Sequence, residues 1–381
     1  MKNSLAVALV AALSLAATQA QAEVRFSGFG QVIAGSTSGE DDRFPMRGYT
    51  NEVDFQEESL FALQIDADLN ERVTATAQLL ADGSEDFEPE LAWAYANVKL
   101  GKGFSTKIGR QRIPFYRYSD FLDVGYAYPW VRPPVAMYNQ PWSNADGISL
   151  SHNTYLGKWF SQAQVIVGRF EGDIDINGAQ VQSELDQLRG VSWDMEYDEW
   201  LSLRAAYLTA DVTISGSSLD GFTGFLRSVG LGNLASGLDY QDDRGTFKSL
   251  GFKVDRANWL VVSEYAELEI DDSVYDSIDR RDWYVSVARR FGAFTPYVNH
   301  GRRDAGQNTA LLRGLPPGSP LHAGVSAAIA SQSLDEQFDS VGVRWDFDSN
   351  VALKADYTRF NSELASTPDA DLVSVGLVYT F

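Results

Sequence analysis

The chain ends in Leu372-Val-Ser-Val-Gly-Leu-Val-Tyr-Thr-Phe381, a run in which two kinds of residue alternate. One face of this run holds Val373, Val375, Leu377, Tyr379 and Phe381, and the other holds Ser374, Gly376, Val378 and Thr380. Such a segment has the length and the pattern of a β-strand that crosses a membrane, with lipid on one side and water on the other. A half-buried edge strand of a soluble sandwich shows the same alternation, so the rest of the chain must decide.

Segments of about ten residues with this alternation recur along the chain. We count sixteen, near residues 24–35, 57–69, 72–83, 89–100, 104–113, 145–155, 158–169, 189–198, 200–212, 246–256, 258–270, 280–291, 293–303, 337–348, 350–361 and 371–381. An even number allows an antiparallel sheet to close with both termini on one side. We therefore expect an all-β chain that folds into a transmembrane antiparallel β-barrel of sixteen strands.

The connections between these segments are of two kinds. Short ones such as 100–103 and 348–350 are rich in the Gly, Asn and Asp that tight hairpin turns need. Long polar ones lie near 36–56, 114–144, 170–188, 213–245, 304–336 and 362–370, and within them His322–Ser331 has the composition of a short helix. Short periplasmic turns and long external loops are typical of outer-membrane barrels. A soluble sandwich has no reason to keep this asymmetry.

The two faces of one segment are especially clear in Phe61–Leu69. Its apolar residues are spaced two apart, while Asp66 and Asp68 lie on the other face. Two carboxylates at this spacing suggest a catalytic pair or a metal site, but a water-filled lumen also accommodates them. We favour the lumen.

The first residues, Met1 to Ala22, read as a secretory signal peptide with cleavage after Ala22. They contain Lys2, the apolar stretch 5–17 and the small residues Ala20 and Ala22, and the apolar stretch is too short to span a bilayer. We expect residues 23–381 to form one barrel domain, because cutting a closed sheet would expose unpaired backbone to lipid. The predicted location is the cell outer membrane.

Composition limits the possible functions. The chain has 52 Asp and Glu against 31 Lys and Arg, a net charge of −21, which argues against binding to nucleic acid. It has no cysteine, and its three histidines lie far apart, so we expect neither a metal site nor a cofactor. Aromatic residues make up 12% of the chain, which suits the aromatic girdles of a membrane protein.

Enzyme motifs are missing from the sequence. It has no phosphate-binding loop, no His-Glu-x-x-His and no Gly-x-Ser-x-Gly. His152, with Ser149 and Ser151 nearby, offers the starting point for a hydrolytic site, and His300 is a second isolated candidate. We expect that the protein is not an enzyme.

The connection near 114–144 is unusually aromatic. It is the third loop on its side of the barrel when the connection between segments 72–83 and 89–100 is counted. It follows Ile108-Gly-Arg-Gln-Arg-Ile-Pro-Phe115, and its rings are Phe115, Tyr116, Tyr118, Phe121, Tyr126, Tyr128 and Trp130. So many rings are too costly to leave in water. We expect this loop to fold inward and pack against the barrel wall.

These features together resemble the sixteen-stranded trimeric general porins of Gram-negative outer membranes. The resemblance rests on Arg25–Gln31 after a signal peptide, the Gly109–Gln111 step, the inward third loop and the terminal Tyr379-Thr-Phe381. It implies passive diffusion of small hydrophilic solutes and ions through a homotrimer. It also implies a pore constriction in which loop acids face a basic wall, formed here by Arg110, Arg112, Arg117, Asp120 and Asp123. The Pro-Glu-Phe type of loop tip found in enterobacterial members is missing.

Two further expectations follow from the residues. An arginine on the lipid face costs roughly 2–4 kcal/mol at the midplane, so Arg110 and Arg112 should face the lumen. The opposite face, with Lys107, Gln111 and Ile113, would then need cover from a neighbouring barrel. Small residues that we expect to face outward allow close approach through the first five or six strands. They are Ala75, Ala77, Ala92, Ala94 and Ala96.

Alternative functions remain open from the sequence. They are a porin specific for an anion or a sugar, an outer-membrane hydrolase, and an adhesion or receptor barrel. The expected partners are outer-membrane lipid and lipopolysaccharide, the barrel assembly machinery, further copies of the chain and small solutes.

Overall fold

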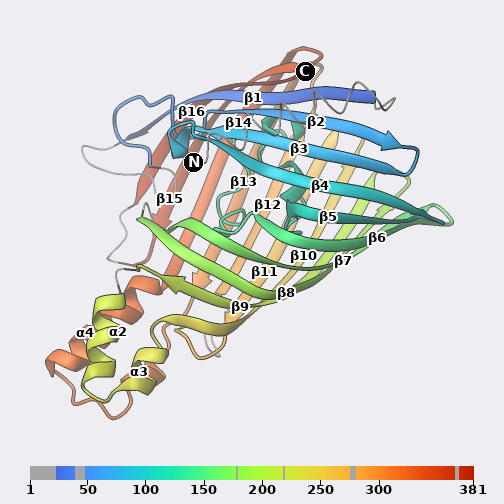
Figure 1. Cartoon of the computed structure of the whole chain (residues 1–381). Coiled ribbons are helices and arrows are strands. Elements are labelled where there is room, and N and C mark those ends of the chain that lie inside the picture. Colours follow the sequence, from blue (N-terminus) through green and yellow to red (C-terminus); the bar gives the residue numbers. More distant parts are fainter. Residues whose placement is uncertain (1–22, 39–47, 177–178, 218, 275–279, 365–368) are drawn as a thin grey trace.

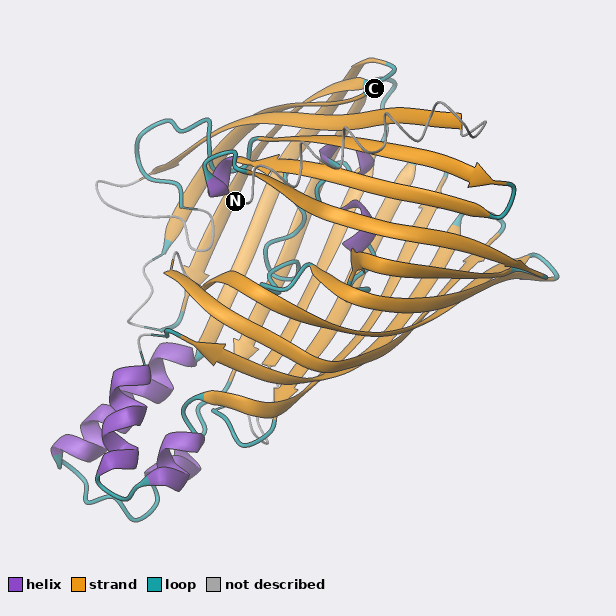
Figure 2. Cartoon of the chain, in the orientation of Figure 1, coloured by secondary structure: helices purple, strands orange, loops and turns teal. Residues whose placement is uncertain are grey.

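The computed structural model describes residues 23–38, 48–176, 179–217, 219–274, 280–364 and 369–381. The predicted signal peptide lies outside these residues. Sixteen strands form one closed barrel in which each strand pairs antiparallel with its neighbours in sequence and β1 pairs with β16 (Figures 1 and 2). The expected fold class and strand number are confirmed.

The first eight strands are β1 (Glu23–Ser38), β2 (Leu60–Asn70), β3 (Val73–Asp82), β4 (Pro89–Gly101), β5 (Phe104–Arg112), β6 (Asn144–Leu156), β7 (Trp159–Ile176) and β8 (Ala179–Tyr197). The others are β9 (Leu201–Ser215), β10 (Tyr240–Arg256), β11 (Trp259–Ile270), β12 (Arg280–Arg289), β13 (Phe294–Ala305), β14 (Leu334–Asp348), β15 (Val351–Ser362) and β16 (Ala370–Thr380). Each overlaps one predicted segment.

One predicted loop is wrong. Within the predicted loop 170–188, residues 170–176 extend β7 and residues 179–188 belong to β8, and Ile174 pairs with Val181 and Glu171 with Glu184. Its alternation is intact, with Ile174, Val181 and Leu185 buried. The many charges of this segment, which suggested a loop, belong to its other, exposed face.

The inner and outer faces follow the alternation. Asp66 is level with Thr76 on the neighbouring strand, and the Thr76 hydroxyl donates to the Asp66 carboxylate at 2.6 Å. Thr74 donates to Asp68 in the same way at 2.8 Å. The two carboxylates are therefore part of a polar ladder on the inner wall, as expected.

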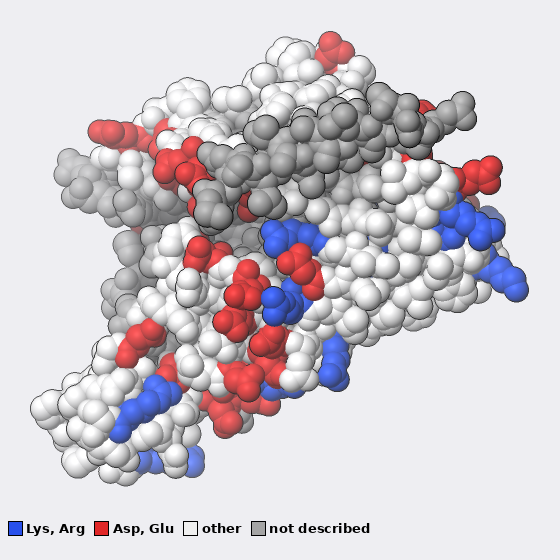
Figure 3. Space-filling model, in the orientation of Figure 1, with Lys and Arg blue, Asp and Glu red and all other residues white. Residues whose placement is uncertain are grey.

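The outer face is a belt of exposed apolar side chains. Val32, Ile108, Val167, Leu250 and Val341 are each about half exposed, from 49% to 62%. Aromatic residues gather beside the short turns at one end of the belt, namely Tyr155, Trp259, Phe291, Phe294, Trp345 and Phe347. Figure 3 shows an uncharged band across the strands facing the viewer, with charged side chains beyond both of its ends. Such a belt suits hydrocarbon bounded by two polar interfaces.

A small helical unit projects from the end of the barrel that carries the long loops (Figure 2). It contains α2 (Asp220–Ser228), α3 (Gly232–Ser236) and α4 (Pro320–Gln332), and the predicted helix is confirmed in α4. Buried residues from the three helices form a common core, including Leu226, Ala235 and Ile329. No helix of the described residues is long and apolar enough to cross a membrane.

Candidate functional site: the folded third loop

The third loop runs inside the barrel, as expected. It leaves β5 at Ile113 and rejoins the wall at β6, with short 3-10 turns at Ser119–Phe121 and Gly125–Ala127. Trp130, Val131 and Met137 in its middle are at most 1% exposed. A loop is buried in this way only when its polar backbone groups find partners on the wall.

Aromatic stacking holds the first half of the loop to the inner wall. Phe115 meets Phe247 of β10 edge to face at 4.9 Å between ring centroids. Tyr118 packs edge to face on Trp130 at 5.4 Å, and Trp130 packs in turn on Tyr284 of β12 at 6.0 Å. Tyr116 also packs on Phe247 and Tyr128 on Trp130, so five of the seven rings counted in the sequence take part in these stacks.

A carboxylate on β11 anchors the loop at two points. Glu264 is only 2% exposed and accepts hydrogen bonds from the hydroxyls of Tyr138 and Tyr284, the latter at 2.9 Å. It also accepts the backbone N–H of Arg117 at 2.8 Å. Burial and the nearby carboxylate hold the pKa of Tyr138 well above its usual value, so this hydroxyl remains a donor.

Two neighbouring cations on β14 and β15 hold the return of the loop. The ammonium of Lys354, which is 1% exposed, donates to the carbonyl oxygens of Gly125, Tyr128 and Trp130 at 2.5, 2.8 and 2.5 Å. Arg344, opposite Lys354 in the sheet, donates to the carbonyl of Tyr126 at 2.6 Å. All three donors of the lysine are thus used on loop backbone.

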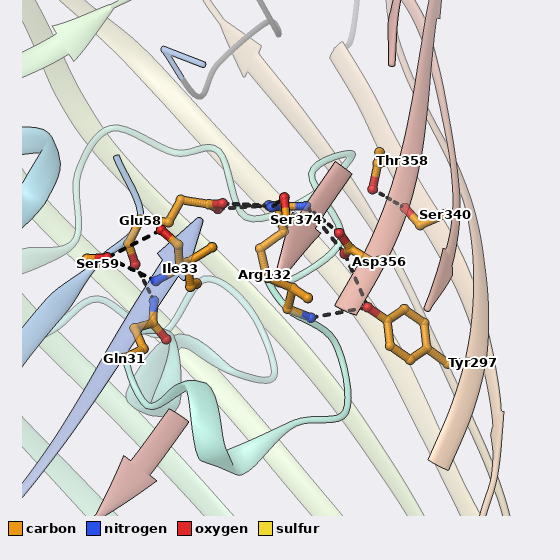
Figure 4. Close-up of polar contacts among 11 residues, drawn as sticks. Gln31, Ile33, Glu58, Ser59, Arg132, Tyr297, Ser340, Asp356, Thr358 and Ser374 are labelled. Atoms are coloured by element: carbon orange, nitrogen blue, oxygen red, sulfur yellow. Dashed lines mark hydrogen bonds and ion pairs between the residues drawn. The ribbon is translucent and has the colours of Figure 1, made fainter. Parts of the chain in front are cut away.

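A third cation, Arg132 of the loop, joins three distant parts of the chain (Figure 4). It pairs with Glu58, which precedes β2, at 2.7 Å and with Asp356 of β15 at 3.2 Å. Tyr297 of β13 donates to Asp356 at 3.2 Å, and Ser374 of β16 accepts from Arg132. Burial alone would lower the pKa of Arg132, but the two carboxylates outweigh it and hold that pKa well above its usual value.

The structure joins two of the five predicted constriction residues directly. Arg112, at the end of β5, forms an ion pair with Asp123 of the loop, and both side chains are largely buried. Asp120 is exposed, and its charge acts on the Arg112 guanidinium. These three residues therefore form one charged group where the loop passes β5.

The other two arginines are placed differently. Arg117 reaches the opposite wall, where its guanidinium donates to the Ser202 hydroxyl at 2.5 Å. Arg110 makes a two-bond ion pair with Asp146 of β6, both bonds at 3.0 Å. Arg110 and Arg117 thus do not face the loop acids across a gap.

In the structure Arg110 does not face the lumen as expected, but the outer side of the wall. Gln111 and Ala145, a cross-strand pair, are buried on the loop side of the wall. Strand alternation therefore puts Arg110 on the other face, which it shares with the exposed Ile108. We expected Arg110 to face the lumen because an arginine on the lipid face is costly at the midplane. The ion pair with Asp146 reduces this cost, because it lies at the end of the apolar belt and not at the hydrocarbon midplane.

No protein-family model matches the chain, and no curated protein matches it. Solved structures do match. The outer membrane channel DcaP of Acinetobacter baumannii gives a TM-score of 0.61 over 94% of this chain and 97% of that chain, at 10% identity. The anion-selective porin from Comamonas acidovorans gives 0.59 over 94% and 100%, at 10% identity. The trimer form of OmpT, an outer membrane protein of Vibrio cholerae, gives 0.54 over 94% and 99%, at 12% identity. The chain has the fold of an outer-membrane porin.

Within this porin fold, the residues that fix the third loop could not be found from sequence. Glu264, Lys354 and Asp356 lie on strands 126 to 229 residues away from their loop partners. A weak sign was available, because Lys354 and Asp356 lie on the inward face of β15 between apolar neighbours. Their partners were not predictable.

Strand alternation separates the residues of the candidate hydrolase site, His152 and Ser149. His152 packs on Phe104 with 4.2 Å between ring centroids. Ser149 is buried on the other face and donates to the side-chain oxygen of Gln111 at 2.6 Å. The ring and the hydroxyl therefore lie on opposite sides of the wall of this porin fold. Among the described residues, no group of Asp, Glu and His has the geometry of a metal site.

Proposed function

We propose that the protein is an outer-membrane pore for passive diffusion of small hydrophilic solutes and ions. The observation that carries this proposal is the third loop, which is fixed inside a closed barrel by buried charges on the wall. The inner wall beside it remains polar, with the ladder of Asp66, Asp68, Thr74 and Thr76. A polar lumen narrowed by a rigid loop passes solutes by size and charge.

The proposed setting is the outer membrane, after export by the signal peptide and insertion by the barrel assembly machinery. The apolar belt would face hydrocarbon, the short turns the periplasm and the long loops the exterior. Charged residues above the belt, such as Arg169 and Arg189, are exposed on its loop side and would meet lipopolysaccharide headgroups.

The proposed constriction is the group of Arg112, Asp120 and Asp123. Arg117 takes the role of a loop anchor and Arg110 that of an outer-face ion pair, and neither is needed in the narrow part of the pore. Removing either member of the Arg112–Asp123 pair would leave the other as an unbalanced charge beside the path of the solute.

We further propose a homotrimer packed through the first strands. Ile65, Ala77, Ala94, Ala96 and Ile108 line a shallow apolar depression on the outer face of β2 to β5. Such a depression accepts a ridge of a second barrel better than flexible acyl chains. Ala92, which we expected to face outward, is buried inside with Phe29 and Leu80 because the β3–β4 register shifts at Gln78/Leu79.

A second candidate within transport is a porin specific for one class of solute, such as an anion or a sugar. One of the matching structures is an anion-selective porin. An enzyme or an adhesin is less well supported. His152 and Ser149 lie on opposite sides of the wall, and the third loop is fixed inside the barrel and not at its outer rim.

Ion conductance tests the proposal. Protein refolded in detergent and added to a planar bilayer should give discrete current steps, and liposomes containing it should swell in small sugars. The matched control is protein heated until the barrel unfolds. Folded protein that inserts but passes neither ions nor sugars would contradict the proposal, and hydrolysis of an ester or peptide without conductance would favour the enzyme.

A further inference from the structure

A row of rings and guanidinium groups crosses the outer face of the barrel where the apolar belt meets the short turns. Arg256 of β10 lies opposite Trp259 of β11 in the sheet register, and Trp259 lies opposite Arg289 of β12. Trp259 is 43% exposed while the next residue, Leu260, is buried, so strand alternation puts Trp259 and its two register partners on the outer face. Cross-strand neighbours lie about 5 Å apart, so the two arginines flank one exposed indole.

Aromatic faces hold both arginines in place. The guanidinium carbon of Arg256, Cζ, lies 4.9 Å from the ring centroid of Trp200. The Cζ of Arg289 lies 4.8 Å from the ring centroid of Trp259 and 4.9 Å from that of Phe291, so this guanidinium contacts two rings. Stacking on aromatic faces restricts the motion of an exposed arginine. The two guanidinium groups are therefore presented at defined places on the outer surface.

No carboxylate of the described residues neutralises these two arginines. Neither of them makes an ion pair or a side-chain hydrogen bond with another described residue. The nearby carboxylates are used elsewhere, because Asp255 pairs with Arg290 and Asp198 pairs with Lys158. Each guanidinium has five N–H donors in a planar fork that suits two oxygens of a phosphate. An anionic group from outside the chain would complete this site.

The surface next to this row, toward the middle of the belt, is flat and apolar. Val254, Val261 and Val287 lie two residues away from the row on the same three strands and are level with one another. Val298 of β13 and Val341 of β14 continue this valine strip, and they are 53% and 55% exposed. Short β-branched side chains in register leave a smooth surface on which an acyl chain can lie. A charged site beside an apolar strip matches the chemistry of a lipid.

We propose that Arg256, Trp259 and Arg289 bind the headgroup of one anionic phospholipid in the periplasmic leaflet. Its phosphate would lie over Trp259, between the two arginines, and its acyl chains would follow the valine strip into the bilayer. The inference goes beyond the proposed pore, and it rests on the proposed membrane setting, with the short turns in the periplasm. A zwitterionic headgroup carries its own ammonium, whose repulsion by the arginines weakens binding.

Native mass spectrometry measures this binding. Delipidated protein in mild detergent should bind phosphatidylglycerol about tenfold more tightly than phosphatidylethanolamine with the same acyl chains, because each arginine beside an anionic lipid contributes up to about fivefold. Arg256→Gln combined with Arg289→Gln should abolish this preference. Arg72→Gln is the matched control, because Arg72 is an exposed arginine in the β2–β3 turn, at the same end of the barrel but outside the row. It should bind both lipids like wild type.

Two further measurements keep the test decisive. Arg256→Lys combined with Arg289→Lys keeps both charges without the planar fork, so it should still prefer phosphatidylglycerol, with an affinity about two- to threefold below that of wild type. Excess inorganic phosphate should not displace the bound lipid, because it cannot use the valine strip. Displacement by phosphate would indicate a site for a soluble anion and would overturn the assignment to a lipid. Heat modifiability checks that each variant is folded.

Equal affinities of the wild-type protein for the two lipids would overturn the inference, as would a double glutamine variant that keeps the preference. Protein that binds phosphatidylglycerol as expected but passes neither ions nor sugars would instead contradict the proposed pore. The two failures are therefore distinguishable.

Discussion

Arg112 and Asp123 form an ion pair that ties the middle of the third loop back to the strand from which the loop departs. Only ten residues separate the two partners in sequence, yet between them the chain crosses to the far wall at Arg117 and returns. The pair therefore ties the returning part of the loop to the end of β5. In the proposed pore, this pair belongs to the charged group at the constriction.

Selectivity should respond to Arg112 and not to Arg110. In Arg112→Ser, the unbalanced Asp123 should strengthen the preference for cations by up to roughly fivefold, the effect of about 1 kcal/mol for one charge at contact distance in water. Arg110→Ser is the matched control, because Arg110 lies on the outer face and pairs with Asp146. Reversal potentials under a salt gradient measure both.

The salt dependence separates local from distant charge. At roughly 0.15 M salt the Debye length is about 8 Å, so the acidic loops at the rim are screened while the constriction is not. The difference between Arg112→Ser and wild type should persist at high salt, and the weak cation preference of wild type should fade. Equal reversal potentials for Arg112→Ser and Arg110→Ser would place the constriction elsewhere.

The sequence predicted the barrel well because its information is local. Alternation within each strand decides which side chains meet lipid, and turn residues decide where strands end, so the positions of β2, β11 and β16 followed directly. Local departures from the alternation could not be recognised in the sequence. The register shift at Gln78/Leu79 turns Ala92 inward, and no feature of the sequence marks it.

The site could be predicted only in part. The inward loop followed from its aromatic content. Arg112 and Asp123 were named from the resemblance to porins, and the structure pairs them. Lys354 contacts Trp130 from 224 residues away, and the pairing depends on closure of the whole barrel. The charged face of 170–176 was mistaken for a loop because an exposed strand face and a loop have similar composition.

Lys354 should control the rigidity of the third loop. Lys354→Met keeps the length of the side chain but leaves the buried carbonyl oxygens of Gly125 and Trp130 without this donor, at about 1–3 kcal/mol each, while the carbonyl of Tyr128 keeps a hydrogen bond from Arg344. We expect the barrel to unfold at a lower temperature and the open channel to show larger current fluctuations.

Lys253→Met is the control for this variant, because Lys253 lies on the inner wall but is partly exposed. It should leave both the unfolding temperature on heating in detergent and the current noise near wild type. Quiet, fully stable channels from Lys354→Met would show that aromatic packing alone holds the loop.

The oligomer should depend on the small outer residues of β3 and β4. Ala77→Arg or Ala94→Arg would place a guanidinium in the apolar depression, and we expect monomers in mild detergent. The lipid-face cost of an arginine, roughly 2–4 kcal/mol at the midplane, applies to both.

Ala205→Arg controls for that cost. Ala205 lies on β9, between the exposed Trp193 and Leu250, far around the barrel from the depression. This variant should insert less well but keep the native oligomer. Wild-type protein that migrates as a monomer without heating would contradict the proposed homotrimer.

The C-terminal residue should be needed for closure of the barrel. The backbone of Phe381 exchanges two hydrogen bonds with Gly28 of β1, at 2.9 and 3.0 Å, and its ring stacks on Phe61 of β2 at 5.9 Å. Deleting Phe381 removes both backbone bonds from the seam between β1 and β16, where unpaired groups would face lipid. We expect less heat-modifiable protein in outer membranes, while export across the inner membrane stays intact.

Phe381→Tyr keeps the backbone bonds and the ring, so it should assemble like wild type. If the deletion variant assembled equally well, the closing strand would not depend on its last residue, and the seam would have to be held by the ten residue pairs from Phe29 to Ser38 alone.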